Sequence, residues 1–399
     1  MKAGVAAALA GALGPALLDG EAVAPRSVEE MAGAAALATE QGWQWKLSGR
    51  GTWVTDDPPA DLELSTRRLT RVLSIAPADL VATVESGVTI AELGAALRPH
   101  RLWWPVDPPG RGERTVGSVV ATATAGPLRH GYGPVRDQFL GCTVVVPDGR
   151  VVETGGRVVK NVAGFDLPKL HAGGFGAFGV IARLHLRLRA VPESDTTLLA
   201  EGDRPRLLAA ADAARDSGVG LCALELLSPA AAGTSEWCLA ARLAGTRTGT
   251  EGEAARLRVA TGIAWHTLGH DHAMSFRDIL ATTAESGSST FRLGCLTGDI
   301  ATTLGLLEAT AGAGATFAGM GTGQLRWSGD VAPAQLIALR RELAAREVPL
   351  TIERAPWALL RAAGHFGSLR NGVGPILARL RSLFDPAGSI VVALEGNHG

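Results

Sequence analysis

Apolar and polar residues follow helical and strand-like spacings in turn along the first part of this 399-residue chain. Residues 27–40 read as a helix, because Ser27 is a suitable N-cap and Glu30 stands three residues later in the capping-box position. Gly42 ends this helix, and a strand then leads to Ser48. The pattern predicts that the chain opens with mixed helices and strands.

Further elements of both kinds follow before residue 192. Residues 81–85 and 140–147 read as strands, and the second of these precedes an Asp-Gly turn. Residues 89–97 read as a helix capped by Thr89, and residues 180–189 alternate apolar and polar positions as a strand does. The first half is therefore expected to be an α+β unit.

After Pro192 the spacing changes to repeated runs of strand, helix and two strands. The expected strands are residues 197–200, 221–227, 236–244, 289–295, 315–318 and 323–328, and the expected helices are residues 205–216, 251–260, 299–311 and 333–346. Such runs favour an antiparallel sheet with helices on one face. We therefore predict two domains, residues 1–192 and 193–399, with a helix near the C-terminus.

Glycine-rich segments carry the chemical signal in the first half. The segment 157–181, RVVKNVAGFDLPKLHAGGFGAFGVI, places Lys160 and Asn161 ahead of closely spaced glycines, which allow the backbone to approach a flat anionic ligand. The glycine spacing does not match the Rossmann fingerprint, and no P-loop is present. Residues 47–53, LSGRGTW, and the run of small residues at 117–126 are further places where a ligand could lie.

In this order, the three segments resemble the FAD-binding domain of the vanillyl-alcohol-oxidase and p-cresol-methylhydroxylase flavoproteins. The segments are SGRGT at 48–52, TVGSVVATATAGPLRHGYGPVRDQFLG at 115–141 and VVKNVAGFDLPKLHAGGFGAFGVI at 158–181. Within that group, the KNVAGFD segment and the short chain most resemble the small flavin-binding subunit of bacterial glycolate oxidase (glycolate dehydrogenase). The resemblance covers roughly residues 20–192. It implies a two-subdomain FAD-binding domain followed by a cap domain.

The resemblance also implies which residues contact FAD. Residues 49–52 correspond to the phosphate-binding loop, the second segment to the wall along the flavin ring and ribityl chain, and the third to the adenine side. The implied FAD contacts are Gly49, Arg50, Gly51, Thr52, Thr115, Gly117, Ser118, Thr122, Gly126, Arg129, Gly131, Val135, Lys160, Gly176, Gly179, Val180 and Ile181.

Two properties of the bound flavin follow from these segments. Lys160, Arg129 and His130 are candidate cations for the negative charge of the reduced flavin. Many relatives attach FAD covalently through a His or Cys, but residues 47–53 contain neither, so non-covalent FAD is expected. His130 is the alternative point of attachment.

The second half shows no recognisable catalytic base or metal site. The 2-hydroxy-acid dehydrogenases that the chain resembles carry an H-x-H metal motif in the cap, whereas residues 319–327 contain no histidine. His266, His270 and His272 resemble metal ligands in spacing, but a loop without metal is favoured. Arg292, Arg326 and Arg354 could each bind a carboxylate, although structural ion pairs are favoured for them.

Composition narrows the class of protein. A formal net charge of −1 argues against a nucleic-acid partner, and the four cysteines lack the spacing of a zinc or iron–sulfur site. Residues 1–18 have the composition of a signal peptide, but Leu9, Leu13 and Leu17 stand at helical spacing and favour a folded helix. We expect a cytoplasmic protein without an integral membrane segment, which reaches the membrane only through partners.

These observations predict the FAD-binding subunit of a glycolate or 2-hydroxy-acid oxidase complex. Its partners would be a second flavoprotein subunit and an iron–sulfur subunit. The alternatives are a self-sufficient FAD-dependent alcohol or hydroxy-acid oxidoreductase and a non-catalytic assembly subunit. The substrate, the electron acceptor and the oligomeric state are left open by the sequence.

Overall fold

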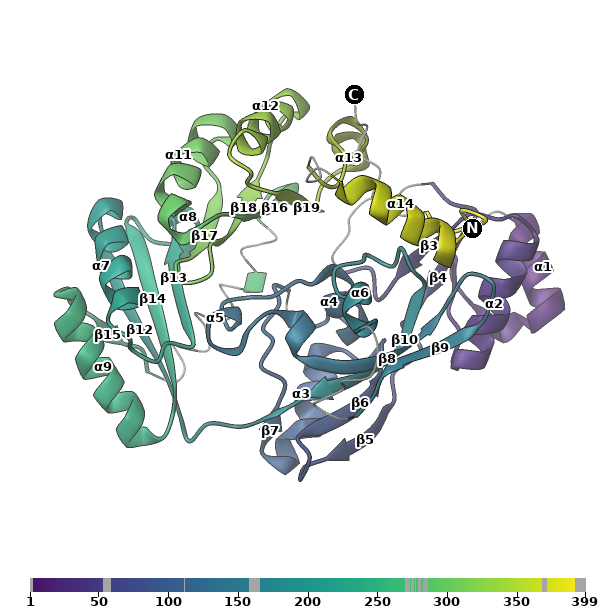
Figure 1. Ribbon diagram of the computed structural model, residues 1–399, viewed down its shortest axis with the longest axis horizontal. Helices are drawn as coiled ribbons and strands as arrows, with labels where there is room; N and C mark the ends of the chain where they lie inside the picture. Colours follow the sequence, from purple (N-terminus) through teal and green to yellow (C-terminus); the bar gives the residue numbers. More distant parts are fainter. Residues whose placement is uncertain are drawn as a thin grey trace.

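A computed structural model describes residues 3–391 except 53–58, 111, 158–165, 270–272, 274–275, 277, 279–280, 283–285 and 368–371. Within these residues the strands form sheets of four, five, two and eight strands (Figure 1). The four- and five-stranded sheets belong to the first half, and the eight-stranded sheet to the second. The mixed helices and strands predicted for both halves are confirmed.

The four-stranded sheet carries the N-terminal helices. Its order is β1 (Leu18–Asp19), β2 (Ala22–Val23), β4 (Leu62–Ser65) and β3 (Trp45–Ser48), with β2 and β3 parallel to β4. Helices α1 (Ala3–Leu13) and α2 (Val28–Glu40) bury Leu9, Met31 and neighbouring alanines beside Trp45.

The start of α2 corrects one detail of the sequence prediction. The Ser27 hydroxyl accepts a hydrogen bond from the Glu30 N–H at 3.1 Å, as an N-cap does. The Glu30 carboxylate, however, accepts from the N–H of Arg26 rather than that of Ser27. The second hydrogen bond of the predicted capping box, from the Ser27 N–H to the Glu30 carboxylate, is therefore wrong, because the carboxylate binds the N–H of the preceding residue.

The five-stranded sheet is antiparallel throughout. Its order is β5 (Val72–Ala76), β6 (Val81–Glu85), β10 (Val180–Arg187), β8 (Phe139–Val145) and β9 (Val151–Gly155). The remaining elements of this half are α3 (Ile90–Leu97), β7 (Leu102–Trp103), α4 (Val116–Thr122), α5 (Arg129–Tyr132), α6 (Pro168–His171) and β11 (Arg189–Ala190). Helix α3 has the complete capping box between Thr89 and Glu92.

The eight-stranded antiparallel sheet begins just after Pro192. Its order is β15 (His266–Thr267), β12 (Ser194–Gly202), β14 (Trp237–Gly245), β13 (Ala223–Leu227), β17 (Ala315–Gly319), β18 (Gln324–Gly329), β16 (Ser289–Gly294) and β19 (Leu350–Arg354). Its helices are α7 (Arg204–Asp216), α8 (Pro229–Ala232), α9 (Arg247–Thr261), α11 (Ile300–Ala311), α12 (Pro333–Ala344) and α13 (Trp357–Ala363). We refer to this unit as the cap.

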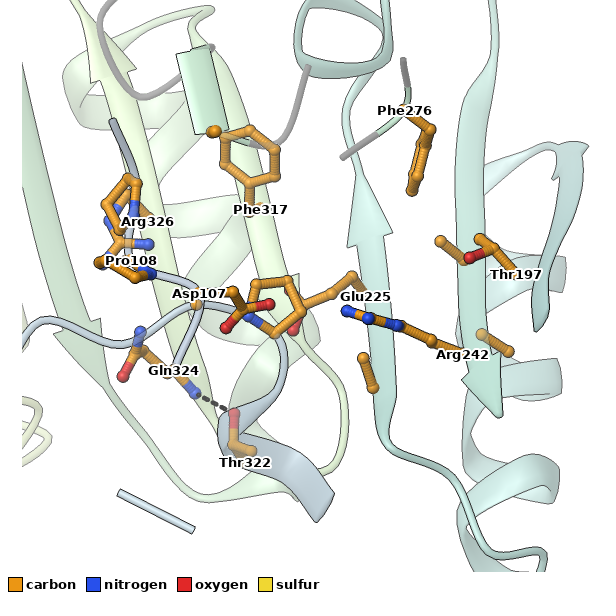
Figure 2. A pocket seen from close by; sticks show the side chains of 17 residues that line it. Asp107, Pro108, Thr197, Glu225, Arg242, Phe276, Phe317, Thr322, Gln324 and Arg326 are labelled. Carbon is orange, nitrogen blue, oxygen red and sulfur yellow. Dashed lines mark hydrogen bonds between the residues drawn. The ribbon is translucent and has the colours of Figure 1, made fainter. Parts of the chain in front are cut away.

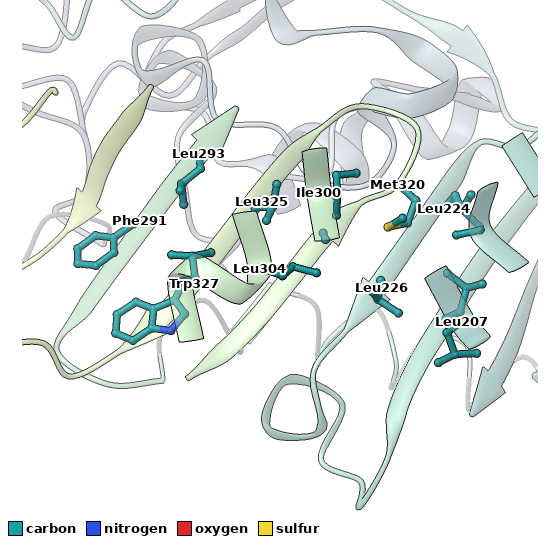
Figure 3. Close-up of a cluster of buried hydrophobic side chains, with 14 of the residues drawn as sticks. Leu207, Leu224, Leu226, Phe291, Leu293, Ile300, Leu304, Met320, Leu325 and Trp327 are labelled. Atoms are coloured by element: carbon teal, nitrogen blue, oxygen red, sulfur yellow. The ribbon is translucent and has the colours of Figure 1, made fainter. Parts of the chain in front are cut away.

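One face of the cap sheet holds the largest hydrophobic core. Alternate strand residues pack against α7, α9, α11 and α12, and Leu224, Leu226, Leu325 and Leu304 lie among them (Figure 3). Phe291 and Trp327 stand opposite each other on β16 and β18, with stacked rings 5.1 Å apart. Because strand side chains alternate, the residues between these core positions lie on the opposite face of the sheet, where some form a second apolar cluster with Ala231 and Phe276 and others face the first half of the molecule.

The end of the chain returns to the first half. Helix α14 (Val373–Phe384) places the Phe384 ring 5.5 Å from that of Phe178, and Ile390 forms a parallel bridge with Trp45 (Figure 1). None of the helices in the described part of the chain is long and apolar enough to cross a lipid bilayer.

Candidate functional site

A long cleft runs along the first half and is closed by the cap and the C-terminal segment. Its cavity volume is about 200 Å³. The first half contributes residues 46–52, Thr66, Arg114, Gly117, Ser118, Ala121, Thr122, Phe175, Gly176 and residues 179–181, and the rest of the lining is residues 353–355, Leu360, His365, Ile390 and Val391. Three glycine-containing segments that are far apart in sequence thus meet at one surface.

Local sequence explains how these segments come together. Thr115 caps α4 by accepting a hydrogen bond from the Ser118 N–H at 3.2 Å, so the first turn of the helix lies beside the cleft. Gly176 has a φ of +80°, and a Cβ there would lie 2.6 Å from Leu47 Cδ1. Only glycine adopts this conformation at low cost and allows this close approach, which brings residues 175–181 against β3.

The charges of the cleft suit a ligand with phosphate groups. Lys46, Arg50, Arg114 and Arg354 line it together with one carboxylate, that of Glu353. Burial lowers the pKa of Arg114 to about 9, which still leaves its guanidinium mainly cationic at neutral pH. An excess of cations at a narrow cleft attracts anions. The donor set therefore fits the diphosphate of FAD.

His365 provides a second indication that the cleft holds a ligand. Its imidazole is 8% exposed, and neither ring nitrogen has a hydrogen-bond partner among the described residues. Burial, with the nearby Arg340 and Arg292, lowers the pKa of His365 to about 4, so the ring is neutral at pH 7. A buried polar ring that lines a cleft without a partner is suited to a ligand that supplies one.

A second cavity lies where the first half meets the cap sheet; we name it the interface cavity. Its volume is about 130 Å³. The lining comprises Asp107, Pro108, Pro109, Gly126 and Pro127 from the first half, and Thr197, Ala223, Glu225, residues 240–242, Phe276, Ala281, Phe317, Thr322, Gln324 and Arg326 from the second. Figure 2 shows Asp107, Glu225 and Arg242 reaching toward the same centre from three different elements.

An ion pair connects the two cavities. Arg326 lines the interface cavity and donates to the carboxylate of Glu353, which lines the long cleft, at 2.7 and 3.2 Å. Arg292 stands opposite Arg326 on the neighbouring strand and lies 3.5 Å from the same carboxylate. Burial opposes the ionisation of Glu353, but Arg326 and Arg292 outweigh it and hold the pKa of Glu353 below its usual value.

The carboxyl groups of Asp107 and Glu225 in the interface cavity differ from that of Glu353, because their pKa values are raised. Burial raises the pKa of Asp107 to about 7, although its carboxylate accepts hydrogen bonds from the Leu128 N–H at 3.1 and 3.2 Å. Burial and the neighbouring Asp107 raise the pKa of Glu225 to about 8. At neutral pH this pair therefore retains at least one proton.

Most of the residues predicted from the sequence to contact FAD line the long cleft. These are Gly49, Arg50, Gly51, Thr52, Gly117, Ser118, Thr122, Gly176, Gly179, Val180 and Ile181. Thr115 lies behind the cleft as the cap of α4, and Val135 is buried in the core of the five-stranded sheet. Lys160 lies outside the described residues.

The remaining predicted residues lie toward the cap. Gly126 lines the interface cavity, and Arg129 donates from Nη1 to Gln324 Oε1 at 2.9 Å. The N–H of Gly131 donates to the carbonyl of Cys222 at 3.1 Å. His130 is packed against Gly321, and burial lowers the pKa of its ring.

The predicted ion-pair role of the cap arginines is found for Arg326 and Arg292, which share Glu353. His266 is exposed on β15, whereas His270 and His272 lie outside the described residues. In the part of the chain that the structure describes, no group of three His, Cys, Asp or Glu residues is placed to hold a metal ion.

Five charged residues that line the two cavities were not predicted from the sequence: Asp107, Arg114, Glu225, Arg242 and Glu353. Glu225 and Arg242 each occupy the one charged position within an otherwise apolar strand of the cap, and Arg326 and Glu353 alternate with apolar residues on β18 and β19. That recurring pattern was the available signal, because charges on the inner face of a strand are rarely placed without a partner or a function.

Comparison with known proteins agrees with this geometry. A family model described as FAD binding domain matches residues 21–155. The glycolate oxidase subunit GlcD of Bacillus subtilis is 30% identical over 181 residues, covering 45% of this chain and 38% of that protein. The glycolate oxidase subunit GlcE of Escherichia coli is 35% identical over 131 residues, covering 33% of this chain and 37% of that protein. Each match thus spans well under half of the relative's length.

Among solved structures, a 4-ethylphenol oxidase from Gulosibacter chungangensis has the same fold. It aligns with a TM-score of 0.73 and 16% identity, covering 97% of this chain and 96% of that one. The likeness extends across both the first half and the cap, and at this identity it concerns the fold alone.

Proposed function

We propose that this chain, a flavoprotein with an FAD-binding domain and the fold of the vanillyl-alcohol-oxidase type, is an FAD-dependent oxidoreductase that acts on a small 2-hydroxy acid. The observation that carries the proposal is the ion pair between Arg326 and Glu353, which connects a cleft suited to FAD with a smaller charged cavity. A flavin enzyme needs this adjacency, because cofactor and substrate must meet. GlcD and GlcE are named as subunits of glycolate oxidase, which points to a hydroxy acid as substrate.

We assign the binding of FAD to the residues that line the long cleft. Residues 49–52 and the first turn of α4 would hold the diphosphate, and residues 176–181 would pack against the adenosine. When bound, FAD supplies the two-electron acceptor for oxidation of the substrate. Arg114 and Arg292 would stabilise negative charge at the cap end of the cleft, and His365 would receive the hydrogen bond that it lacks in the protein.

We further propose that the chain works as one subunit of a complex, because both relatives are named as glycolate oxidase subunits. A second flavoprotein subunit would be one partner, and an iron–sulfur subunit would carry the electrons onward. The two predicted domains, residues 1–192 and 193–399, would bind FAD and complete the substrate side respectively.

A self-sufficient oxidoreductase is the second candidate. The observation in its favour is that the interface cavity and the long cleft lie within this one chain and are joined by the ion pair between Arg326 and Glu353. In that case, substrate oxidation would need no partner, and only transfer of electrons to an acceptor would remain.

An anaerobic absorbance titration tests the proposal. The purified FAD-loaded protein is mixed with glycolate and then with D-lactate, alone and with its partner subunits, and the band near 450 nm is followed. Bleaching by either acid supports the oxidoreductase, and bleaching without partners favours the self-sufficient form. An intact flavin that stays oxidised with both acids and all partners would contradict the proposal.

A further inference from the structure

The interface cavity contains buried charged groups that the binding of FAD in the long cleft does not explain. Polar residues of the cap strands β12, β13, β14 and β18 line it, and those of β16 and β19 lie beside it, while the other face of the sheet forms the apolar core. Inward charges of this kind are costly unless they are paired or serve a ligand.

Two carboxyl groups meet in the cavity without a basic partner of their own. Glu225 on β13 stands directly opposite Gly319 on β17, and a Cβ at Gly319 would lie 3.2 Å from Glu225 Oε1. The missing side chain at Gly319 leaves room for the glutamate carboxyl. Asp107 enters from the loop before α4 and is held by the Leu128 N–H (Figure 2).

The nearby arginines already have carboxylates of their own. Arg242 donates through Nε and Nη2 to Asp195 at 2.8 and 2.7 Å, and Arg326 is paired with Glu353. The arginines at the cavity are Arg242 and Arg326, with Arg292 beside Arg326, and the carboxylates paired with them are Asp195 and Glu353. One positive charge therefore remains when Asp107 and Glu225 are both protonated, and one negative charge remains when both are ionised.

We propose that the interface cavity is a proton-linked binding site for a small carboxylate of the 2-hydroxy-acid class, with Arg242 as its anchor and the carboxyls of Glu225 and Asp107 as the groups that hold the accompanying proton. The identity of the ligand class rests on the proposed function. The charge balance itself does not, since it depends only on residues of this chain.

The size and the polar groups of the cavity suit such a ligand. A volume of about 130 Å³ leaves room for roughly ten water-sized groups, enough for a small acid. The Nη1 group of Arg242 takes no part in the pair with Asp195. Thr197, which is 4% exposed, has a hydroxyl without a hydrogen-bond partner among the described residues and lines the cavity. A ligand that carries a carboxylate and a hydroxyl group can hydrogen-bond to both the Arg242 guanidinium and the Thr197 hydroxyl.

The proton linkage has a definite sign. An anion in the cavity favours the protonated form of the carboxyl pair, so it raises the pKa values of the pair, and binding takes up a proton at pH values where the free pair is ionised. The charged groups that face Glu225 and Asp107, apart from each other, are Arg242 on β14 and Arg326 on β18. Affinity should be constant below about pH 6 and fall as the pH rises through 7 and 8, by up to about tenfold per pH unit for each linked proton.

Calorimetry on the FAD-loaded full chain tests this proposal. D-lactate is titrated between pH 6 and 9 in buffers of different ionisation enthalpy, which reports proton uptake directly. Lactamide serves as the uncharged probe and ethanolamine as the cationic probe. We expect D-lactate to bind with proton uptake near pH 8, and the two other probes to bind at least about tenfold more weakly.

Two variants sharpen the test. Glu225→Gln keeps the volume and removes one of the two carboxyls that hold the proton, so the fall in D-lactate affinity between pH 6 and 9 should be about tenfold smaller than in the unaltered protein, with Asp107 as the remaining linked group. Glu251→Gln, on the exposed side of α9, is the matched control and should keep the pH dependence of the unaltered protein. Thermal unfolding of both variants shows whether the fold is retained, and Asp107→Asn replaces Glu225→Gln if the latter does not fold.

The outcomes separate this inference from the proposed function. Binding of D-lactate without proton uptake, or with the same pH dependence in Glu225→Gln, would overturn the inference even if the acid bleaches the flavin. Tighter binding of ethanolamine would overturn it as well. Proton-linked binding of D-lactate to a flavin that stays oxidised even with all partner subunits present would support the site and contradict the proposed oxidation.

Discussion

Arg326 and Glu353 form a two-bond ion pair, at 2.7 and 3.2 Å, whose cation lines one cavity and whose anion lines the other. The two residues lie on β18 and β19, which flank β16, and Arg292 of β16 reaches the same carboxylate. A single glutamate thus compensates two neighbouring buried arginines. The pair fixes the relation between the cap strands at the place where FAD and substrate are proposed to meet.

We predict that Glu353→Gln destabilises the protein by about 3–5 kcal/mol, because it leaves two buried guanidinium groups without their carboxylate. Urea unfolding followed by circular dichroism measures the loss. The control is Glu308→Gln, which breaks the exposed pair between Arg204 and Glu308 and should cost less than about 1 kcal/mol. Equal costs for the two variants would show that the central pair has no special role in stability.

Replacing Gly176 by alanine should release FAD. A Cβ at this position would lie 2.6 Å from Leu47 Cδ1, and the φ of +80° adds strain of about 1 kcal/mol or more. The measurement is the ratio of flavin absorbance to protein absorbance after gel filtration. Gly262→Ala is the matched control, since Gly262 has a φ of +62° with nothing within 4 Å of its Cβ position. Full flavin content in Gly176→Ala would argue against the proposed adenosine contact.

FAD should be released from the protein by acid. The loop 47–52 offers no His or Cys side chain, and His130 is packed against Gly321 of the cap. We expect the yellow colour in the supernatant after acid precipitation and centrifugation. Colour retained in the pellet would indicate a covalent bond, and its loss in His130→Ala would then identify the attachment point.

Arg114 should raise the reduction potential of the bound flavin. Its guanidinium is buried in the wall of the long cleft and donates to Thr122 Oγ1 at 3.0 Å. Removing one nearby positive charge disfavours the reduced, more negative flavin, so Arg114→Met should lower the potential by about 30 mV or more, equivalent to about 1.4 kcal/mol for two electrons. A dye-coupled reductive titration measures it. Arg68→Met, in the ion pair with Asp19, is the control and should leave the potential unchanged.

The sequence was sufficient to predict most of the strands and helices of the cap, though not α8, β15 and α13 or the bounds of β19, and the glycine segments of the long cleft. These features are local: a cap such as Thr89 or an alternating strand such as β10 is specified by nearby residues. The run of small residues at 117–126 was seen as a surface for a ligand, but its first part is the helix α4, because Thr115 supplies a cap that starts it. A run of small residues does not by itself show whether the segment forms a helix or an extended chain.

The interface cavity could not be predicted in the same way. Asp107 and Glu225 come from separate halves of the chain, and Arg326 and Glu353 from strands separated by α12. Their meeting depends on the order β13, β17, β18, β16, β19, which the alternation of each strand does not contain. The face of each charged residue could be inferred, but its partners could not.

The last prediction concerns stability in acid. Burial lowers the pKa values of His171 and His365 to about 4, below the value near 6.5 expected for the unfolded chain. The unfolded state therefore binds protons that the folded state does not, so stability is fully present above about pH 6.5 and declines as the pH falls toward 4. Urea midpoints measured between pH 7 and 4.5 should decrease steadily. His365→Gln should reduce this slope, whereas His100→Asn, at an exposed turn, should not. If the pH dependence of the urea midpoint is the same in His365→Gln, the imidazole has the same protonation in the folded and unfolded states, which would require a partner such as bound FAD. Repeating the urea titrations after removal of FAD distinguishes such a ligand contact from a ring that is only buried.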